Sequence, residues 1–194
     1  MNNSRSSHYS VCMNRTTLAA EIAKVAMLRG TFTLRSGKTS HYYLDKYLFS
    51  TRPEILRELG ALFAARIPAG TSRLAGAELG GIPLVSAASM ASGLPCLFIR
   101  NQKKEYGTAK QLEGKLERGD RVMIVEDVAT TGGQALEAAK VLREGGAEIT
   151  AIISVIDRME GARENIQAAG ILFDSLFTVK DLGIVPDAAT ATQL

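Results

Sequence analysis

Two adjacent carboxylates, Glu126 and Asp127, separate a run of four apolar residues from a segment rich in threonine and glycine. The apolar run at 122–125 is typical of a strand that is buried on both faces of a parallel sheet. Gly132 and Gly133 then open a helix, whose N-terminus offers unpaired backbone N–H groups and the positive end of its dipole. Carboxylates repel a bare phosphate, so the two acids suit sugar hydroxyls or a divalent cation beside it. The segment therefore predicts an anion site next to a hydroxyl site at the end of a strand.

The elements that must position this segment alternate along the chain. The strand-like segments are residues 73–77, 96–100, 121–126, 149–156 and 171–178, and the helical ones are residues 83–92, 134–144 and 160–169. This alternation predicts an α/β fold with a central parallel sheet flanked by helices. Residues 101–118 are polar and charged, with neither helical nor strand periodicity.

The first fifty residues have a different pattern. A helical spacing begins at Leu18 and ends at Gly30, and a short strand, a turn and an aromatic run follow. We expect residues 16–50 to form a small hairpin-type hood, with a second helix opening at Pro53. Residues 1–15 are polar and rich in serine and asparagine, so we interpret them as a disordered leader, with Met1 and Met13 as alternative starts. Residues 16–194 then form one domain.

Composition narrows the class of protein. The chain has 194 residues, of which 46% are hydrophobic and 22% charged, and these values exclude a disordered, collagen-like or coiled-coil protein. The net charge is +3, yet residues 1–52 hold eight Lys or Arg against two acids. A local basic surface on a balanced protein suits a small anionic ligand and not a nucleic acid. Two separated cysteines indicate free thiols in a reducing cytoplasm, and no apolar run approaches the roughly 20 residues that span a membrane.

Residues 122–134 resemble the phosphoribosyl pyrophosphate motif of the type I phosphoribosyltransferases. The resemblance implies that Glu126 and Asp127 hold the 2′ and 3′ hydroxyls of the ribose, and that the following loop cradles the 5′-phosphate. The loop residues implicated in this way are Val128, Ala129, Thr130, Thr131, Gly132, Gly133 and Gln134. A central parallel sheet with an N-terminal hood is the fold that this family implies.

Four further segments resemble the orotate phosphoribosyltransferases, in that family's order. Residues 32–43 are similar to the N-terminal signature, 75–83 to the pyrophosphate loop, 100–108 to the mobile catalytic loop, and 157–158 to the Asp-Arg pair that contacts orotate. The pyrophosphate loop implicates Glu78, Leu79, Gly80 and Gly81. The residues implicated in orotate binding are Arg35, Tyr43, Thr130 and Arg158. An arginine can meet the orotate carboxylate with two parallel hydrogen bonds, and a tyrosine can lie near its flat ring.

The catalytic loop is the source of the expected cations. The resemblance implicates Arg100, Lys103, Lys104 and Tyr106 in binding phosphoribosyl pyrophosphate. The spacing from Arg100 favours Lys104 as the catalytic lysine, with Lys103 as the alternative. Gly80 stands where many members of the family carry a lysine, so part of the usual positive charge is missing from the pyrophosphate loop.

The implied activity is the transfer of the ribose 5-phosphate group to orotate, which gives orotidine 5′-monophosphate and pyrophosphate in pyrimidine biosynthesis. The resemblance also implies Mg²⁺ held through substrate and water, with no direct protein ligand, and a cytoplasmic homodimer with shared active sites. A purine phosphoribosyltransferase is the first alternative, and residues 157–158 and the Arg35 segment disfavour it. A non-catalytic regulator that binds phosphoribosyl pyrophosphate is the second, but only residues 1–15 are spare for a nucleic-acid-binding element.

Overall fold

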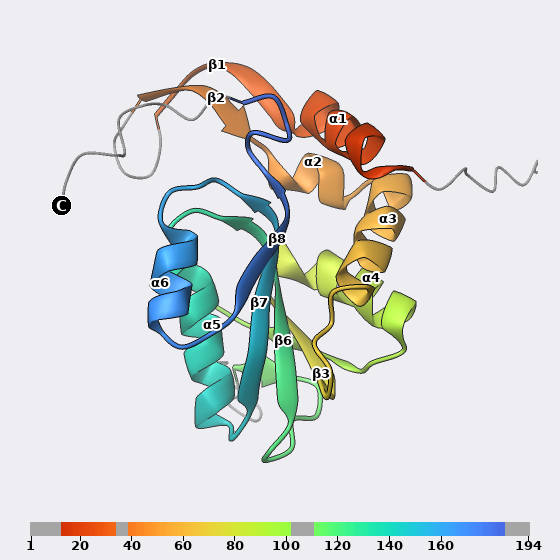
Figure 1. Ribbon diagram of the computed structural model, residues 1–194, viewed down its shortest axis with the longest axis vertical. Helices are drawn as coiled ribbons and strands as arrows, with labels where there is room; N and C mark the ends of the chain where they lie inside the picture. The colour runs from red at the N-terminus through yellow and green to blue at the C-terminus, as the bar shows by residue number, and fades with distance from the viewer. Residues whose placement is uncertain (1–12, 34–38, 102–110, 185–194) are drawn as a thin grey trace, which may run out of the picture.

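The computed structural model describes residues 13–33, 39–101 and 111–184, and a mixed but mainly parallel sheet lies at its centre (Figure 1). The strand order among these residues is β5-β4-β3-β6-β7-β8. The strands are β3 (Arg73–Ala77), β4 (Cys96–Ile99), β5 (Leu112–Glu113), β6 (Arg121–Ala129), β7 (Glu148–Asp157) and β8 (Phe173–Thr178). The short β5 pairs antiparallel with β4, and the other neighbouring pairs are parallel. The predicted α/β fold is therefore confirmed.

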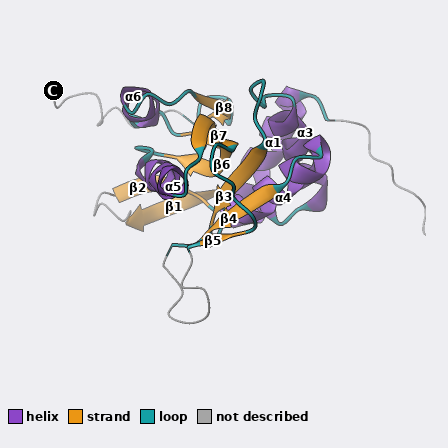
Figure 2. Cartoon of the chain, turned by 90° about the horizontal axis from the view of Figure 1, so that it is seen from below, coloured by secondary structure: helices purple, strands orange, loops and turns teal. Residues whose placement is uncertain are grey.

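Helices cover both faces of this sheet, as the view from below shows (Figure 2). One face carries α1 (Arg15–Ala26), α3 (Pro53–Ala64) and α4 (Gly81–Ser92), and the other carries α5 (Gly133–Glu144) and α6 (Ala162–Ala168). Each face has its own apolar core, centred on residues such as Leu59 and Met123 on one side and Ile124 and Leu142 on the other. Within the described ranges, no helix is long and apolar enough to cross a membrane.

The N-terminal elements form the predicted hood. It consists of α1, the antiparallel hairpin of β1 (Met27–Thr33) and β2 (Thr39–Leu44), and the short helix α2 (Lys46–Ser50). The hairpin lies beyond one end of the central sheet (Figure 1). Asn14 caps α1 by accepting a hydrogen bond from the Thr17 backbone N–H at 2.9 Å.

Several element boundaries differ from those that the sequence predicts, and two short elements were not predicted. The first helix begins at Arg15, which we assigned to the leader, because its guanidinium pairs with Asp181 at 3.0 Å and tethers the helix start. That helix stops at Ala26 and not near Gly30, because Met27 and Leu28 pair with β2 instead. Helix α2 and strand β5 were not predicted, since both are too short to show a periodicity. Residues 1–12 of the expected leader lie outside the described part of the chain.

Candidate active site

Strand β6 carries the two central carboxylates further into the fold than the sequence indicates. We expected the strand to end at Glu126, but its pairing with β7 continues to Ala129, which lies opposite Asp157. Glu126 and Asp127 are only 5% and 2% exposed. The parallel pairing extends past both residues, and Lys46 of the hood contacts Asp127.

Asp127 is held at both of its carboxylate oxygens. Oδ1 accepts a hydrogen bond from the Val128 backbone N–H at 2.6 Å, and Oδ2 lies 2.7 Å from the ammonium of Lys46, on the hood helix α2. Burial lowers the pKa of Lys46. The attraction of Asp127 and Glu126 outweighs this effect and leaves the Lys46 pKa raised. Asp127 is therefore fixed at both of its oxygens.

Glu126 has the opposite electrostatic character. Burial, together with the neighbouring Asp127 carboxylate, raises the pKa of Glu126 to about 8. Its Oε2 atom is buried and has no hydrogen-bond partner. At neutral pH Glu126 thus holds a proton, and the ammonium of Lys46 balances the charge of Asp127. The pair accordingly repels an incoming anion much less than two bare carboxylates would.

The loop after β6 has the geometry of an anion site. Residues 130–132 connect the strand to α5, whose first residue is Gly133. Gly132 caps the helix with φ 80°, and a Cβ atom there would lie 2.9 Å from Ile166, so only glycine fits. The Asn165 side chain donates a hydrogen bond to the Thr131 carbonyl at 2.9 Å and fixes the loop from α6. The predicted turn of threonines and glycines at a helix N-terminus is confirmed.

A second turn, residues 78–81, faces the same carboxylates from the end of β3. It contains a cis peptide bond between Glu78 and Leu79, and Gly81 begins α4. The Asn101 backbone N–H donates to Glu78 Oε1 at 2.6 Å, and the Gln134 amide donates to the Glu78 carbonyl at 3.4 Å. This turn therefore ties the end of β4 to the start of α5.

Gly80 makes the closest approach to Asp127. A Cβ atom at position 80 would lie 1.7 Å from Asp127 Oδ2, so no side chain fits while the carboxylate keeps its place. We expect Gly80→Ala to displace Asp127 and lower kcat/KM by roughly tenfold or more, because an electrostatic contact to the substrate would be misplaced. Steady-state kinetics measures this effect. Gly93→Ala is the matched control, since a Cβ atom there meets nothing within 4 Å, although its positive φ costs some stability. Full activity in Gly80→Ala would contradict the close contact.

Arg158 joins the hood to the sheet. It follows β7, and its backbone N–H donates to the Ala129 carbonyl at 2.9 Å, beside the anion loop. Its guanidinium lies 5.5 Å from the ring centre of Tyr42, donates to the Tyr42 hydroxyl at 3.3 Å, and pairs with Glu160 at 2.9 Å. Tyr43 is 45% exposed and contacts Phe32 instead. Of the two neighbouring tyrosines, Tyr42 is therefore the one on which Arg158 packs.

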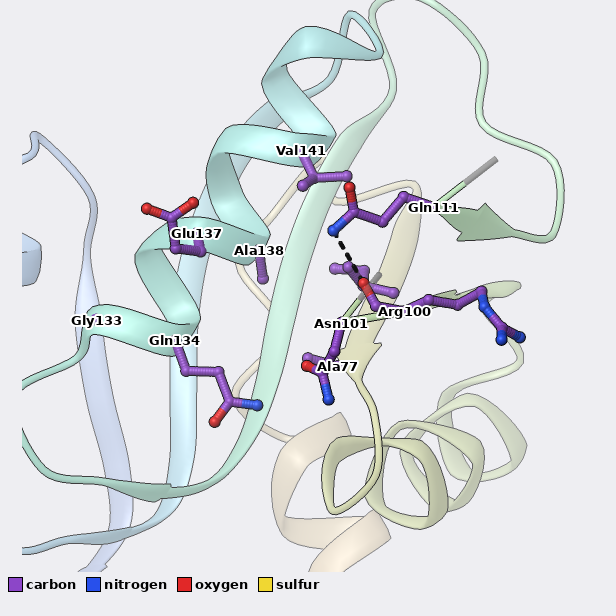
Figure 3. Close-up of a pocket in the computed structure, with 10 residues that line it drawn as sticks. Ala77, Arg100, Asn101, Gln111, Gly133, Gln134, Glu137, Ala138 and Val141 are labelled. Atoms are coloured by element: carbon purple, nitrogen blue, oxygen red, sulfur yellow. Dashed lines mark hydrogen bonds between the residues drawn. The ribbon is translucent and has the colours of Figure 1, made fainter. Parts of the chain in front are cut away.

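A pocket of about 610 Å³ lies between the ends of β3 and β4 and the start of α5 (Figure 3). Gly133 and Gln134 belong both to this pocket and to the anion loop, while Arg100 and Asn101 line its opposite wall. Gln111 donates to the Arg100 carbonyl at 2.9 Å (Figure 3). The pocket thus extends the anion site toward the end of β4.

Four of the predicted site residues, Arg35, Lys103, Lys104 and Tyr106, lie outside the described residues. Conversely, the sequence reasoning missed Lys46. The local signal for it was weak, namely a single lysine after Asp45, which caps the short helix α2. No pattern in the sequence connects that position with Asp127.

Comparisons with known proteins agree with this geometry. The model of the phosphoribosyl transferase domain family matches residues 53–181. A protein of Natronomonas pharaonis named orotate phosphoribosyltransferase is 47% identical over 79% of this chain and 87% of its own length. One of the same name from Methanocaldococcus jannaschii is 44% identical over 79% and 87%.

Solved structures show the same relationship. The crystal structure of Mycobacterium tuberculosis orotate phosphoribosyltransferase in complex with 5-phospho-α-D-ribosyl 1-diphosphate aligns with a TM-score of 0.74 and 31% identity. The alignment covers 88% of this chain and 99% of that one. The chain belongs to the phosphoribosyltransferase family, and within that family its relatives named above are orotate phosphoribosyltransferases.

Proposed function

We propose that the protein transfers the 5-phosphoribosyl group of phosphoribosyl pyrophosphate to orotate in pyrimidine biosynthesis, giving orotidine 5′-monophosphate and pyrophosphate. The observation that carries this proposal is the arrangement at one end of the sheet. Asp127, paired with Lys46, and the buried Glu126 lie between the glycine loop that opens α5 and the turn at Gly80. The identity of 43–47% with relatives named orotate phosphoribosyltransferase supports orotate over a purine as the acceptor.

The chain's residues act by positioning and electrostatics. In the reaction the bond from ribose C1 to the pyrophosphate oxygen breaks, a ring nitrogen of orotate forms a bond to that carbon, and the proton of that nitrogen passes to the leaving pyrophosphate or to water. The ribose ring gains positive charge on the way, so a fixed carboxylate such as Asp127 stabilises the transition state more than the ground state. The backbone N–H groups of the loop at 130–133 hold the phosphate end of the donor. We expect Arg158, beside that loop, to bind the orotate carboxylate.

We propose that the reaction uses Mg²⁺, which would reach the site with the donor substrate and not on a cage of protein ligands. The described residues contain no group of three His, Cys, Asp or Glu that could hold a metal ion by themselves. The two carboxylates fit a metal ion that has no direct protein ligand. Asp127 is already paired with Lys46, and the raised pKa of Glu126 disfavours its ionised form. When bound, the ion neutralises charge on the leaving pyrophosphate.

The test is a spectrophotometric assay of orotate with phosphoribosyl pyrophosphate and Mg²⁺. We expect the ultraviolet absorbance of orotate to fall only when both other components are present, and chelation of the metal to stop the reaction. Adenine, hypoxanthine and uracil serve as competing acceptors. Turnover of adenine or hypoxanthine would favour a purine enzyme. Binding of the donor without turnover of any base would favour a regulator.

We also propose that the protein acts as a homodimer in which each active site is completed by the partner's Lys104. Support comes from the family resemblance and from the path of the chain. The Arg100 backbone N–H donates to the Gln111 carbonyl at 2.9 Å, so the two described residues on either side of this loop lie together at the edge of the site. The turn at 78–81 carries no cation of its own for the pyrophosphate.

Mixing two inactive variants, Lys104→Ala and Asp127→Asn, tests the shared site. Random exchange makes about half of the dimers mixed, and one of their two sites has both residues, so we expect about a quarter of wild-type activity. Mass spectrometry verifies that the subunits exchange. The matched control is the same mixing experiment with Lys103→Ala in place of Lys104→Ala. Exchange without recovered activity would show that Lys104 acts within its own chain or not at all.

A further inference from the structure

We propose that Lys46 is a positioning residue for the transfer reaction: from the hood, its ammonium holds the Asp127 carboxylate in the orientation that the ribose hydroxyls meet. This inference rests on the proposed function. It assigns a role to a hood residue that was not expected in the site. The hood would then contribute to the site of the donor substrate as well as to orotate binding.

The geometry of Asp127 supports this role. Each oxygen of an ionised carboxylate can accept about two hydrogen bonds. Lys46 Nζ uses one position on Oδ2 at 2.7 Å, and the Val128 backbone N–H uses one on Oδ1 at 2.6 Å. Both oxygens are therefore fixed in direction, and each keeps capacity for a hydroxyl donor. A carboxylate held at only one oxygen would be free to rotate about its last torsion.

The surroundings of Asp127 leave little room for a substitute cation from the nearby turn. A side chain at Gly80 would collide with Oδ2, which is the oxygen that Lys46 contacts. The ammonium therefore reaches the carboxylate from the hood while the backbone of the turn closes the other side. The side chain of Lys46 is 30% exposed and the side chain of Asp127 is 3% exposed. The ion pair is therefore partly accessible to solvent from the lysine side.

The short helix α2 sets the position of Lys46. Asp45 caps this helix by accepting a hydrogen bond from the Tyr47 backbone N–H at 3.0 Å. Phe49 and Ser50 at its other end are buried. The ammonium also lies 5.7 Å from the centre of the Tyr47 ring. The packing of the hood thus determines where the charge sits relative to β6.

The charge of Lys46 has a second consequence for the substrate. Phosphoribosyl pyrophosphate is a polyanion, and a buried bare carboxylate would repel it. With Lys46 in place, Asp127 is neutralised before the donor arrives, yet it keeps the negative oxygens that ribose hydroxyls need. Removing the ammonium therefore impairs both the orientation of Asp127 and the approach of the donor.

The experiment is a double-mutant cycle between Lys46 and Asp127. Lys46→Met keeps the length of the side chain and removes the charge, and Lys46→Gln keeps a hydrogen-bond donor should the methionine variant fold poorly. We expect Lys46→Met to lower kcat/KM for the donor by roughly 10- to 100-fold, as for the loss of a charge-assisted hydrogen bond. Lys46→Arg should recover most of this loss. In the Asp127→Asn background, Lys46→Met should change kcat/KM by about twofold or less, because the residue through which Lys46 acts is already altered.

Controls separate this role from simple support of the fold. Lys24→Met, at an exposed lysine elsewhere in the hood, should leave the kinetics unchanged. Wild-type kinetics in Lys46→Met, or an equal loss with and without the Asp127 substitution, would overturn the proposal. If the wild-type protein does not turn over orotate, the proposed function fails. Calorimetric binding of phosphoribosyl pyrophosphate to the wild type and Lys46→Met then tests Lys46 independently, and equal affinities would refute it.

Discussion

Asp127→Asn is expected to lower kcat/KM for orotate and phosphoribosyl pyrophosphate by roughly 10²–10³, the cost of removing one preorganised electrostatic contact from a transition state. Asparagine keeps the shape of aspartate, but it removes the negative charge that faces the developing positive charge on the ribose. Steady-state kinetics over a range of both substrates measures the loss. A larger effect on kcat than on KM would place the contact in the transition state.

The same substitution should also destabilise the fold, because it leaves Lys46 without its counter-ion. We expect a loss of about 1–3 kcal/mol, below the roughly 3–5 kcal/mol for a fully buried pair, since Lys46 remains partly exposed. Asp174→Asn is a control for the substitution itself, since the Asp174 side chain on β8 is 48% exposed. Unchanged turnover in a folded Asp127→Asn protein would remove this residue from the mechanism.

Glu126 should make the protein less stable as the pH rises. Its pKa is about 8 in the folded chain, against 4.5 as the ordinary value. Between these values the unfolded chain releases the proton and the folded chain retains it, so the free energy of unfolding falls with rising pH. One pKa unit corresponds to about 1.4 kcal/mol, and we therefore expect a loss on the order of 4 kcal/mol between roughly pH 4.5 and pH 8.

Urea denaturation at several pH values, compared between the wild type and Glu126→Gln, isolates this contribution. Glutamine does not titrate, so the variant should lose less stability than the wild type over that window and become the more stable of the two near pH 8.5. Asp181 supplies an internal contrast, because the Arg15 guanidinium lowers its pKa to about 2 and it contributes stability that is lost only in acid. Parallel pH curves for the two proteins would mean that Glu126 titrates normally.

The sequence by itself determined the architecture. Continuous apolar runs such as 122–125 and alternating helical segments predicted a parallel sheet with helices on both faces, because burial on both sides requires that pattern. The glycines and threonines at 130–133 predicted the anion loop, since these residue types are needed locally for a helix N-terminus that approaches a ligand. Such features depend on near neighbours along the chain and can be recognised from the sequence alone.

Only the tertiary structure decided the electrostatics of the site. The burial of Glu126 and Asp127 depends on how far β6 pairs with β7 and on the hood above them, and neither is encoded in the residues nearby. The pairing of Lys46 with Asp127 joins two positions far apart in the chain, and the close approach of Gly80 involves a third. A pKa depends on solvent exclusion and on charges within a few ångströms, whatever their distance in sequence. For that reason the sequence identified the carboxylates, while the fold determined that burial raises the pKa of Glu126 and that a hood lysine pairs with Asp127.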